Sequence, residues 1–122
     1  MKTKIFFSHS KKTFDTRKER RELKFLEDYY SDKVIICPNH DFGEISDARQ
    51  YNPTIDICSI LIVSERKGYL DMGEFVSVAR AFSNKTPVFA IRTYELEFYL
   101  TQVTGIEIIN ESDWIDKYAI LL

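Results

Sequence analysis

Short apolar runs alternate along this chain with longer segments in which apolar residues recur at helical spacing. Four of the apolar runs predict strands, and they are Lys4–Phe7, Val34–Cys37, Ile57–Val63 and Pro87–Ile91. The third run is apolar almost throughout, which is typical of a central strand buried on both faces of a sheet. A fifth strand is expected at Ile106–Ile109.

Helices are predicted between these strands. Apolar residues recur every three or four positions in Thr13–Tyr30 and again in Asp71–Phe82, which indicates an amphipathic helix for each. Tyr94–Gln102 suggests a shorter helix, and Ser112 can cap a last one. The segment from Asn39 to Pro53 is polar and rich in loop-forming residues, with room for only a short helical turn.

This alternation predicts a parallel sheet whose strands are joined by right-handed crossovers. Five strands in 122 residues indicate one domain over residues 1–122, an α/β three-layer flavodoxin-like sandwich with strand order 2-1-3-4-5. The first and third strands then meet at the topological switch point, where ligands bind beyond the carboxyl ends of the strands. The loop at Ser8-His9-Ser10 should therefore lie beside the loop from Ser64 to Asp71.

Charge and composition narrow the classes of partner. The net charge is −2, from 17 basic and 19 acidic residues, which gives no overall attraction to nucleic acid polymers or anionic membranes. The basic cluster Arg17–Arg21 is interleaved with acids, and we interpret it as a solvated helix face. No apolar run approaches the ~18 residues of a membrane span, and no secretory leader is recognised, so a cytoplasmic protein is expected.

The two cysteines, Cys37 and Cys58, each lie in or at the end of an apolar run. This placement predicts buried, reduced thiols and no disulfide framework. Neither cysteine belongs to a CxxC or His–Cys ligand pattern, so no structural metal site is expected. The glycine-rich motifs of phosphate loops and dinucleotide-binding folds are also missing from the sequence, and no bound cofactor is expected.

Two carboxylates, Asp71 and Glu74, follow the central strand at the predicted start of a helix, in a loop that contains Gly68 and Gly73. Cleavage of a glycosidic bond requires a carboxylate beside the anomeric carbon, because positive charge develops there. Glu74 would take that role, while Asp71 would accept hydrogen bonds from sugar hydroxyls. The alternative is a capping box, with Asp71 at the N-cap and Glu74 three residues later, which involves no catalysis.

Ser8, His9 and Ser10 follow the first predicted strand. Small hydroxyl residues at such a position can bind a phosphate or the 5′ end of a sugar, and His9 can carry a proton. In the alternative interpretation, Ser10 only caps the next helix and His9 is solvated.

The polar loop His40–Glu44, together with Tyr51 and Asp56, is a third candidate group that could hold a base. An ordinary surface connection is the alternative for this loop, and Asp56 could only end the turn before the central strand.

These motifs together resemble the nucleoside 2-deoxyribosyltransferase-like superfamily. The matching segments, within about residues 3–92, are Lys4–Ser10, Asp56, Asp71-Met72-Gly73, Glu74, Ala79-Arg80-Ala81 and Lys85-Thr86-Pro87. The resemblance implies the 2-1-3-4-5 sheet, Glu74 as the nucleophile on deoxyribose, and cleavage or base exchange at the N-glycosidic bond. It also implies a possible homodimer, and aromatic residues, which are enriched at interfaces, are abundant here: Tyr29, Tyr30, Phe98 and Tyr99.

The segment Ile5–Ser10 also resembles the opening of Toll/interleukin-1 receptor (TIR) domains, some of which cleave NAD at its N-glycosidic bond. Both resemblances imply a small-molecule nucleoside, nucleotide or NAD as the substrate. A non-enzymatic nucleotide-binding or protein-interaction module on the same scaffold is the third possibility, because fold does not decide function.

Overall fold

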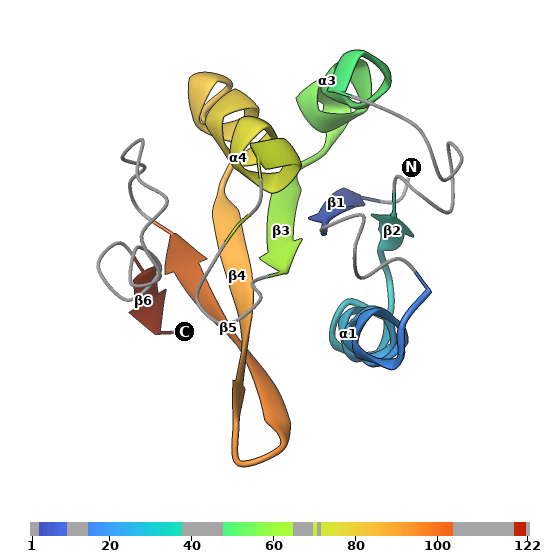
Figure 1. The fold of residues 1–122 in the computed structure, drawn as a ribbon. Helices are drawn as coiled ribbons and strands as arrows, with labels where there is room; N and C mark the ends of the chain where they lie inside the picture. Colours follow the sequence, from blue (N-terminus) through green and yellow to red (C-terminus); the bar gives the residue numbers. More distant parts are fainter. Residues whose placement is uncertain are drawn as a thin grey trace.

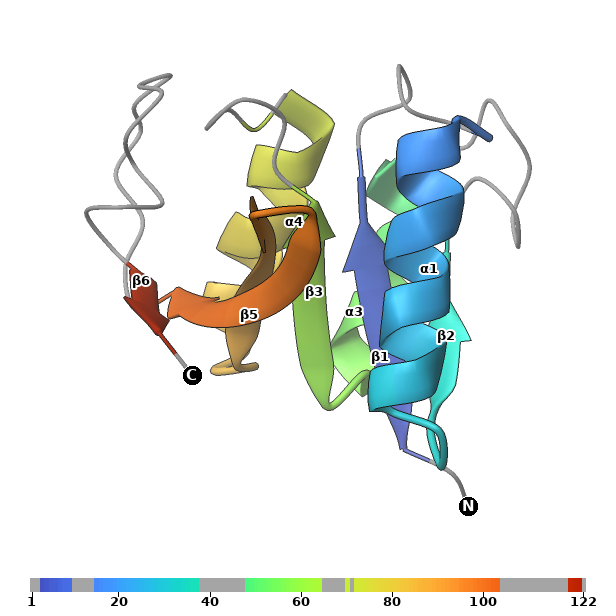
Figure 2. The ribbon, with the colours of Figure 1, turned by 90° about the horizontal axis from the view of Figure 1, so that it is seen from below.

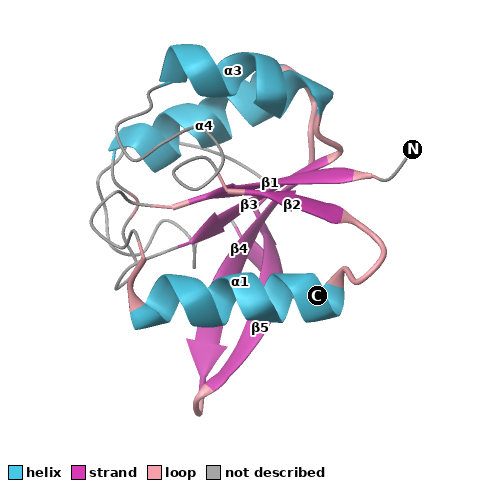
Figure 3. Ribbon diagram, turned by 90° about the vertical axis from the view of Figure 1, so that its right-hand side faces the viewer, coloured by secondary structure: helices cyan, strands magenta, loops and turns pink. Residues whose placement is uncertain are grey.

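The computed structural model describes residues 3–9, 15–37, 48–64, 70, 72–103 and 119–121. These residues form one mixed sheet with the strand order β2-β1-β3-β4-β5-β6 (Figure 1). Helix α1 covers one face of the sheet, and helices α3 and α4 cover the other (Figure 3). Within these ranges the chain is therefore an α/β sandwich of three layers.

The strands are β1 (Lys4–Ser8), β2 (Val34–Ile36), β3 (Ile60–Ser64), β4 (Val88–Tyr94), β5 (Glu97–Val103) and β6 (Ala119–Leu121). The helices are α1 (Arg17–Tyr29), α3 (Ala48–Ile57) and α4 (Met72–Ser83). None of the helices in the described part of the chain has the length and apolar composition needed to cross a membrane.

The predicted order 2-1-3-4-5 is confirmed for the first five strands, but the sheet is not parallel throughout. Strand β1 pairs in parallel with β2 and β3, and β3 pairs in parallel with β4. Strand β5 runs antiparallel to β4, and β6 runs antiparallel to β5. The prediction of an all-parallel sheet is therefore wrong at the β4–β5 pair, where a hairpin replaces a crossover.

This hairpin occupies the segment Tyr94–Gln102 that the sequence suggested as a helix, and that prediction is wrong. A two-residue turn, Glu95-Leu96, joins the strands, and both residues have positive φ, 48° and 68°. Positive φ at both central positions is the requirement of a type I′ turn, which is usually met by Asn-Gly. Because the chain places Glu and Leu there, the sequence carries no turn signal.

The fold after β5 also differs from the prediction. The expected strand Ile106–Ile109 lies outside the described residues, so the fifth strand of the sheet is a different segment, Glu97–Val103. The last helix expected from Ser112 also falls mostly outside them, and the described residues at its end, Ala119–Leu121, form strand β6 and not a helix.

Helix α3 replaces much of the loop expected up to Pro53, and it continues into the run predicted as the third strand. It carries Pro53 in its interior and ends at Ile57, so β3 begins only at Ile60. Ile55 is fully buried, whereas Ile57 is 62% exposed. The apolar run that begins at Ile57 thus contains the exposed end of a helix and a buried strand. A short apolar run alone does not show where one ends and the other begins.

Strands β1 and β3 are buried on both faces, and successive side chains point to opposite layers. Phe6 of β1 and Leu61 of β3 pack with α3 and α4 in one cluster. Phe7 of β1 and Ile62 of β3 pack with Leu26 of α1 in the other cluster. This alternation also fixes the layer to which the polar residues at the strand ends belong.

Helix α1 runs alongside β1 and β2 (Figure 2). Its residues Phe25 and Arg21 also contact β5. The rings of Phe25 and Phe98 lie 5.6 Å apart, and the Arg21 guanidinium lies 5.4 Å from the centre of the Phe98 ring. Phe98, one of the aromatics considered for a dimer interface, therefore packs within the chain, whereas Tyr29 is 57% exposed.

The β4–β5 turn generates a stability prediction. Replacing Glu95 by Asn and Leu96 by Gly should raise the free energy of unfolding by about 1–2 kcal/mol, because positive φ is unfavourable for Glu and Leu but suits Asn-Gly. Urea denaturation measures the change. The control Leu96→Ala keeps the β-carbon and should stay within about 0.5 kcal/mol of the wild type. A double variant no more stable than the wild type would contradict the positive-φ turn.

Candidate functional site

Strands β1 and β3 end side by side in Ser8 and Ser64, at the carboxyl edge of the parallel part of the sheet. Ser8 is in register with Val63, one residue before Ser64. Both serines are buried, yet strand alternation sends their side chains to opposite layers. Ser8 belongs to the layer of α3 and α4. Ser64 belongs to the layer of α1, and so does His9, the residue that follows the end of β1.

On the α1 side, Ser64 lies in a network with two residues of the helix. Its hydroxyl contacts both carboxylate oxygens of Glu22, at 2.7 and 2.9 Å, and accepts a hydrogen bond from Lys18 Nζ at 2.8 Å. Lys18 Nζ also lies 2.9 Å from Glu22 Oε1. Burial raises the pKa of Glu22, and the charge and hydrogen bonds of Lys18 and Ser64 oppose that shift only in part.

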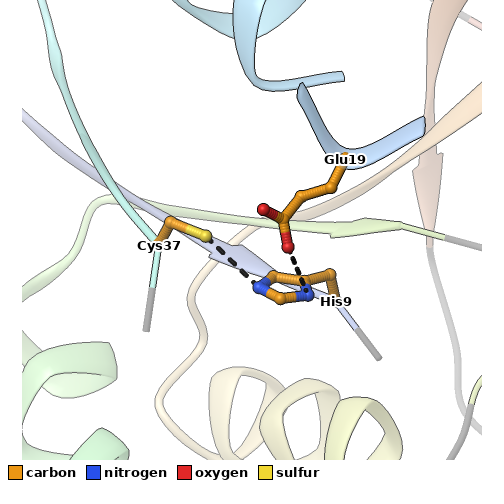
Figure 4. Close-up of side chains that lie close together, drawn as sticks. All are labelled: His9, Glu19 and Cys37. Atoms are coloured by element: carbon orange, nitrogen blue, oxygen red, sulfur yellow. Dashed lines mark hydrogen bonds and ion pairs between the residues drawn. The ribbon is translucent and has the colours of Figure 1, made fainter. Parts of the chain in front are cut away.

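His9, Glu19 and Cys37 form a second polar group in the same layer (Figure 4). His9 Nδ1 lies 3.2 Å from Glu19 Oε2, and His9 Nε2 lies 3.2 Å from Cys37 Sγ. All three residues are buried, and one ligand atom from each lies within 4.8 Å of the others. The ends of β1 and β2 and the first turn of α1 thus bring together a thiol, an imidazole and a carboxylate.

The start of α1 holds Glu19 in place. Thr16 is the N-cap and its hydroxyl accepts a hydrogen bond from the Glu19 amide at 3.3 Å. The side chain of Glu19 reaches back, and its Oε1 accepts a hydrogen bond from the Asp15 amide at 3.1 Å. The Thr16-x-x-Glu19 spacing is a capping-box signature, so one oxygen of Glu19 caps the helix while the other contacts His9.

The sequence interpretation missed these two glutamates of α1. The basic residues of the Arg17–Arg21 cluster are at least partly exposed, but Glu19 and Glu22 are 0% and 2% exposed. Glu19, Glu22 and Leu26 recur at helical spacing, so the acids extend the buried stripe of α1 toward the carboxyl edge of the sheet. This spacing was visible in the sequence and could have predicted that Glu19 and Glu22 are buried.

Glu74 lies on the other side of the sheet, in the first turn of α4. It is 2% exposed, and it shares its helix face with the buried residues Val78 and Ala81. Because β3 and β4 run in parallel, α4 starts at the carboxyl edge that holds Ser8. Gly73 is exposed beside it, and its carbonyl accepts a hydrogen bond from the Ser77 hydroxyl at 3.1 Å.

Several predicted site residues lie outside the described residues. These are Ser10, Gly68, Asp71 and the loop His40–Glu44. Tyr51 is described, and its ring packs 6.1 Å from that of Phe6 in the α3–α4 layer. Asp71, one of the residues outside these ranges, is the partner of Glu74 in the capping-box alternative.

Asp56 is not brought to the carboxyl edge. It lies near the end of α3, just before β3, and therefore at the amino edge of the sheet. Its carboxylate accepts hydrogen bonds from Arg80 Nε at 2.8 Å and from Asn84. The hydrogen bond from Arg80 holds the pKa of Asp56 below its ordinary value. In this structure Asp56 joins α3 to α4.

A surface hollow lies between α1 and the β4–β5 hairpin, next to the Lys18 network. Cationic side chains of α1 line one wall, and the hairpin supplies the other. The lining residues are Arg17, Lys18, Arg21, Thr93, Leu96 and Phe98. The α1 wall of this hollow is therefore cationic, and the hollow lies in the layer opposite Glu74.

Comparison of the chain with protein-family models, with curated proteins and with solved structures finds no match.

The buried Glu22 generates a prediction on pH. Because its pKa is raised in the folded chain, the folded state binds a proton there more readily than the unfolded state. Through Glu22 the free energy of unfolding should therefore fall as the pH rises from the ordinary value of 4.5 through the raised pKa. Glu22→Gln should remove this component.

Urea denaturation of both proteins between that pH and neutrality measures it. The stability of the wild type relative to Glu22→Gln should decline as the pH rises. Glu27→Gln, an exposed glutamate of the same helix, is the matched control. Parallel pH profiles for the wild type and Glu22→Gln would contradict the assignment.

Proposed function

We propose that this protein cleaves or exchanges the N-glycosidic bond of a small nucleoside or nucleotide, with Glu74 as the carboxylate at the anomeric carbon. The observation that supports the proposal is the position of Glu74. It is a carboxylate 2% exposed to solvent, in the first turn of α4 at the carboxyl edge of parallel strands. Ligands bind at this edge in open α/β sheets.

The chemistry follows from charge. As the bond between sugar and base breaks, positive charge develops at the anomeric carbon, and a fixed carboxylate stabilises it or attacks it. The amino end of a helix attracts negative charge through the helix dipole, and Glu74 lies in the first turn of α4. A site shielded from water strengthens this interaction, because the effective dielectric constant is low there.

Ser8 supplies a second polar group for the same ligand. It ends β1, the neighbour of β3, and strand alternation places it in the layer of α4. In the proposed complex its hydroxyl binds the 5′ end of the sugar, while Glu74 faces the anomeric carbon. The resemblance to nucleoside 2-deoxyribosyltransferase-like proteins supports the same assignment of Glu74. Water as the acceptor would make the reaction a hydrolysis, and a second base would make it an exchange.

Two other functions remain as candidates. The TIR-like opening Ile5–Ser10 favours NAD as the substrate, cleaved at the bond between nicotinamide and ribose. A nucleotide-binding module without catalysis is favoured by the position of Glu74 as the third residue of α4, where a capping-box acid lies. A panel of substrates distinguishes NAD cleavage from nucleoside cleavage. A substitution at Glu74 distinguishes catalysis from nucleotide binding alone.

The test compares Glu74→Gln with the exposed control Glu27→Gln. Each protein is incubated with nucleosides, deoxynucleosides, their 5′-phosphates and NAD, and released base is measured by chromatography. Glu74→Gln should lower the rate of base release by at least about a hundredfold, because an amide neither attacks nor neutralises the developing charge. Glu27→Gln should leave the rate unchanged.

Thermal unfolding with the same compounds gives the second measurement. A ligand that raises the melting temperature of the wild type should also raise that of Glu74→Gln, since the substitution keeps the shape of the side chain. Binding with no base release by the wild type would favour the non-enzymatic module. Equal rates for the wild type and Glu74→Gln would overturn the role of Glu74.

A further inference from the structure

We propose that Cys37 is a nucleophilic thiol, activated by His9 and Glu19, that reacts with small hydroperoxides. The site lies in the α1 layer of the sheet, whereas Glu74 belongs to the α4 layer. The inference is therefore independent of the glycosidic chemistry proposed above, and one can fail while the other stands.

The order of the three groups carries the inference. Glu19 Oε2 contacts one ring nitrogen of His9, Nδ1, and Cys37 Sγ contacts the other, Nε2, each at 3.2 Å (Figure 4). Glu19 lies at ion-pair distance from Nδ1. In the tautomer with the proton on Nδ1, the lone pair of Nε2 faces the thiol. Carboxylate, imidazole and nucleophile in this order are the arrangement in which a base takes the proton of a thiol and a third group orients the base.

Glu19 is fixed for this task. One of its oxygens accepts a hydrogen bond from the Asp15 amide at 3.1 Å, and the other contacts His9. The carboxylate belongs to the first turn of α1, and a swing away from His9 would break its hydrogen bond from Asp15. An imidazolium formed at His9 would lie against this buried carboxylate, which stabilises the pair of thiolate and imidazolium.

The same three residues are also a possible metal-ligand set, but their orientation argues against one shared ion. A ligating histidine binds metal through one nitrogen and uses the other for an outer partner. Here the carboxylate and the thiol lie at different nitrogens of His9. An ion bound to Nε2 and Cys37 would leave Glu19 at Nδ1, outside its coordination shell.

Burial decides the class of reactant. Cys37 is 4% exposed, His9 is 7% exposed and Glu19 is fully buried, and a small electrophile needs the least opening of such a site. A hydroperoxide is small and reacts with thiolates. The Cys37 sulfur attacks the terminal oxygen, an S–O bond forms and the O–O bond breaks. The leaving oxygen takes the proton held by His9, so the products are a sulfenic acid and water or an alcohol. Sulfur loses two electrons and the peroxide gains them.

The second cysteine provides an internal control. Cys58 is 6% exposed, nearly the same as Cys37, but it packs in the opposite layer of the sheet, with Ile55 and Leu61. Burial raises the pKa of the Cys58 thiol to about 11. Because the exposures are similar, a difference in reactivity does not report access, but the raised pKa of Cys58 contributes to it. Activation of Cys37 is therefore read from its own pH profile and from the substitutions of His9 and Glu19. The sheet between the two layers also prevents Cys58 from forming a disulfide with Cys37.

The first experiment uses the unsubstituted full chain in a chelator. The protein is treated with hydrogen peroxide in the presence of dimedone, which traps sulfenic acids, and labelling of each cysteine is measured by peptide mass spectrometry. Cys37 should be labelled and Cys58 should not. Alkylation by iodoacetamide at neutral pH should be at least about tenfold faster at Cys37, because only the thiolate reacts. In urea the two rates should become equal.

The second experiment tests the roles of the partners. His9→Gln and Glu19→Gln should each slow alkylation of Cys37 at least about tenfold and move the inflection of its rate profile to higher pH, because the thiolate loses its stabilisation. Glu27→Gln should leave both unchanged. Melting temperatures verify that each variant is folded. If either substitution prevents folding, the pH profile of Cys37 in the wild type decides, and it should inflect well below the ordinary thiol value of about 8.5.

Two results would overturn the proposal. One is equal alkylation of Cys37 and Cys58 in the folded chain. The other is a slow Cys37 in the chelator, together with a Zn²⁺-dependent rise in melting temperature that Cys37→Ser abolishes. That second result would make the three residues a metal site.

Discussion

The burial of β1 and β3 on both faces is the constraint on which the rest of this structure depends. A strand covered on both sides can end in a polar residue only if the layer above or below supplies a partner. At Ser64 and at His9 the partners are glutamates from the first turns of α1. The polar residues at the ends of the central strands therefore require polar partners on the buried face of α1. This requirement explains why acids continue the buried stripe of that helix.

Three glutamates are almost fully removed from water around this edge: Glu19, Glu22 and Glu74. Burial of a carboxylate is unfavourable unless hydrogen bonds and opposite charges offset the lost hydration. For Glu22 the offset is visible, since Lys18 and Ser64 contact it, and it is incomplete, since the pKa stays raised. Buried titratable groups with shifted pKa values are found more often at functional sites than in ordinary cores.

The sequence was sufficient for the parts of the fold that follow regular patterns. Apolar runs located β1 and β4, and helical spacing located α4. Their alternation predicted the order 2-1-3-4-5, but the fifth strand is a different segment from the one expected and runs antiparallel. The pattern failed where local chemistry was atypical. The turn at Glu95-Leu96 has positive φ without Asn or Gly, and α3 contains a proline, so neither element carries its usual signal.

The candidate site was predictable to a similar degree. Ser8 and Glu74 lie at the carboxyl edge of the sheet, as expected. Asp56 lies at the amino edge, because it precedes β3, and Arg80 holds it there. The group of His9, Glu19 and Cys37 could not be assembled from the sequence. Its members come from the ends of two strands and a helix start, and only strand alternation and helix phase determine which of them share a layer.

The lengths of the outer strands have a consequence for the behaviour of the protein in concentrated solution. Strands β2 and β6, which lie at the ends of the described sheet, are each three residues long. A strand this short presents few unpaired amide and carbonyl groups to another chain, and short edge strands are one way in which proteins avoid edge-to-edge aggregation. The apolar strand β3, whose sequence would favour intermolecular β-pairing, lies in the interior of the sheet between β1 and β4, and the apolar part of β4, Val88–Ile91, is paired on both sides.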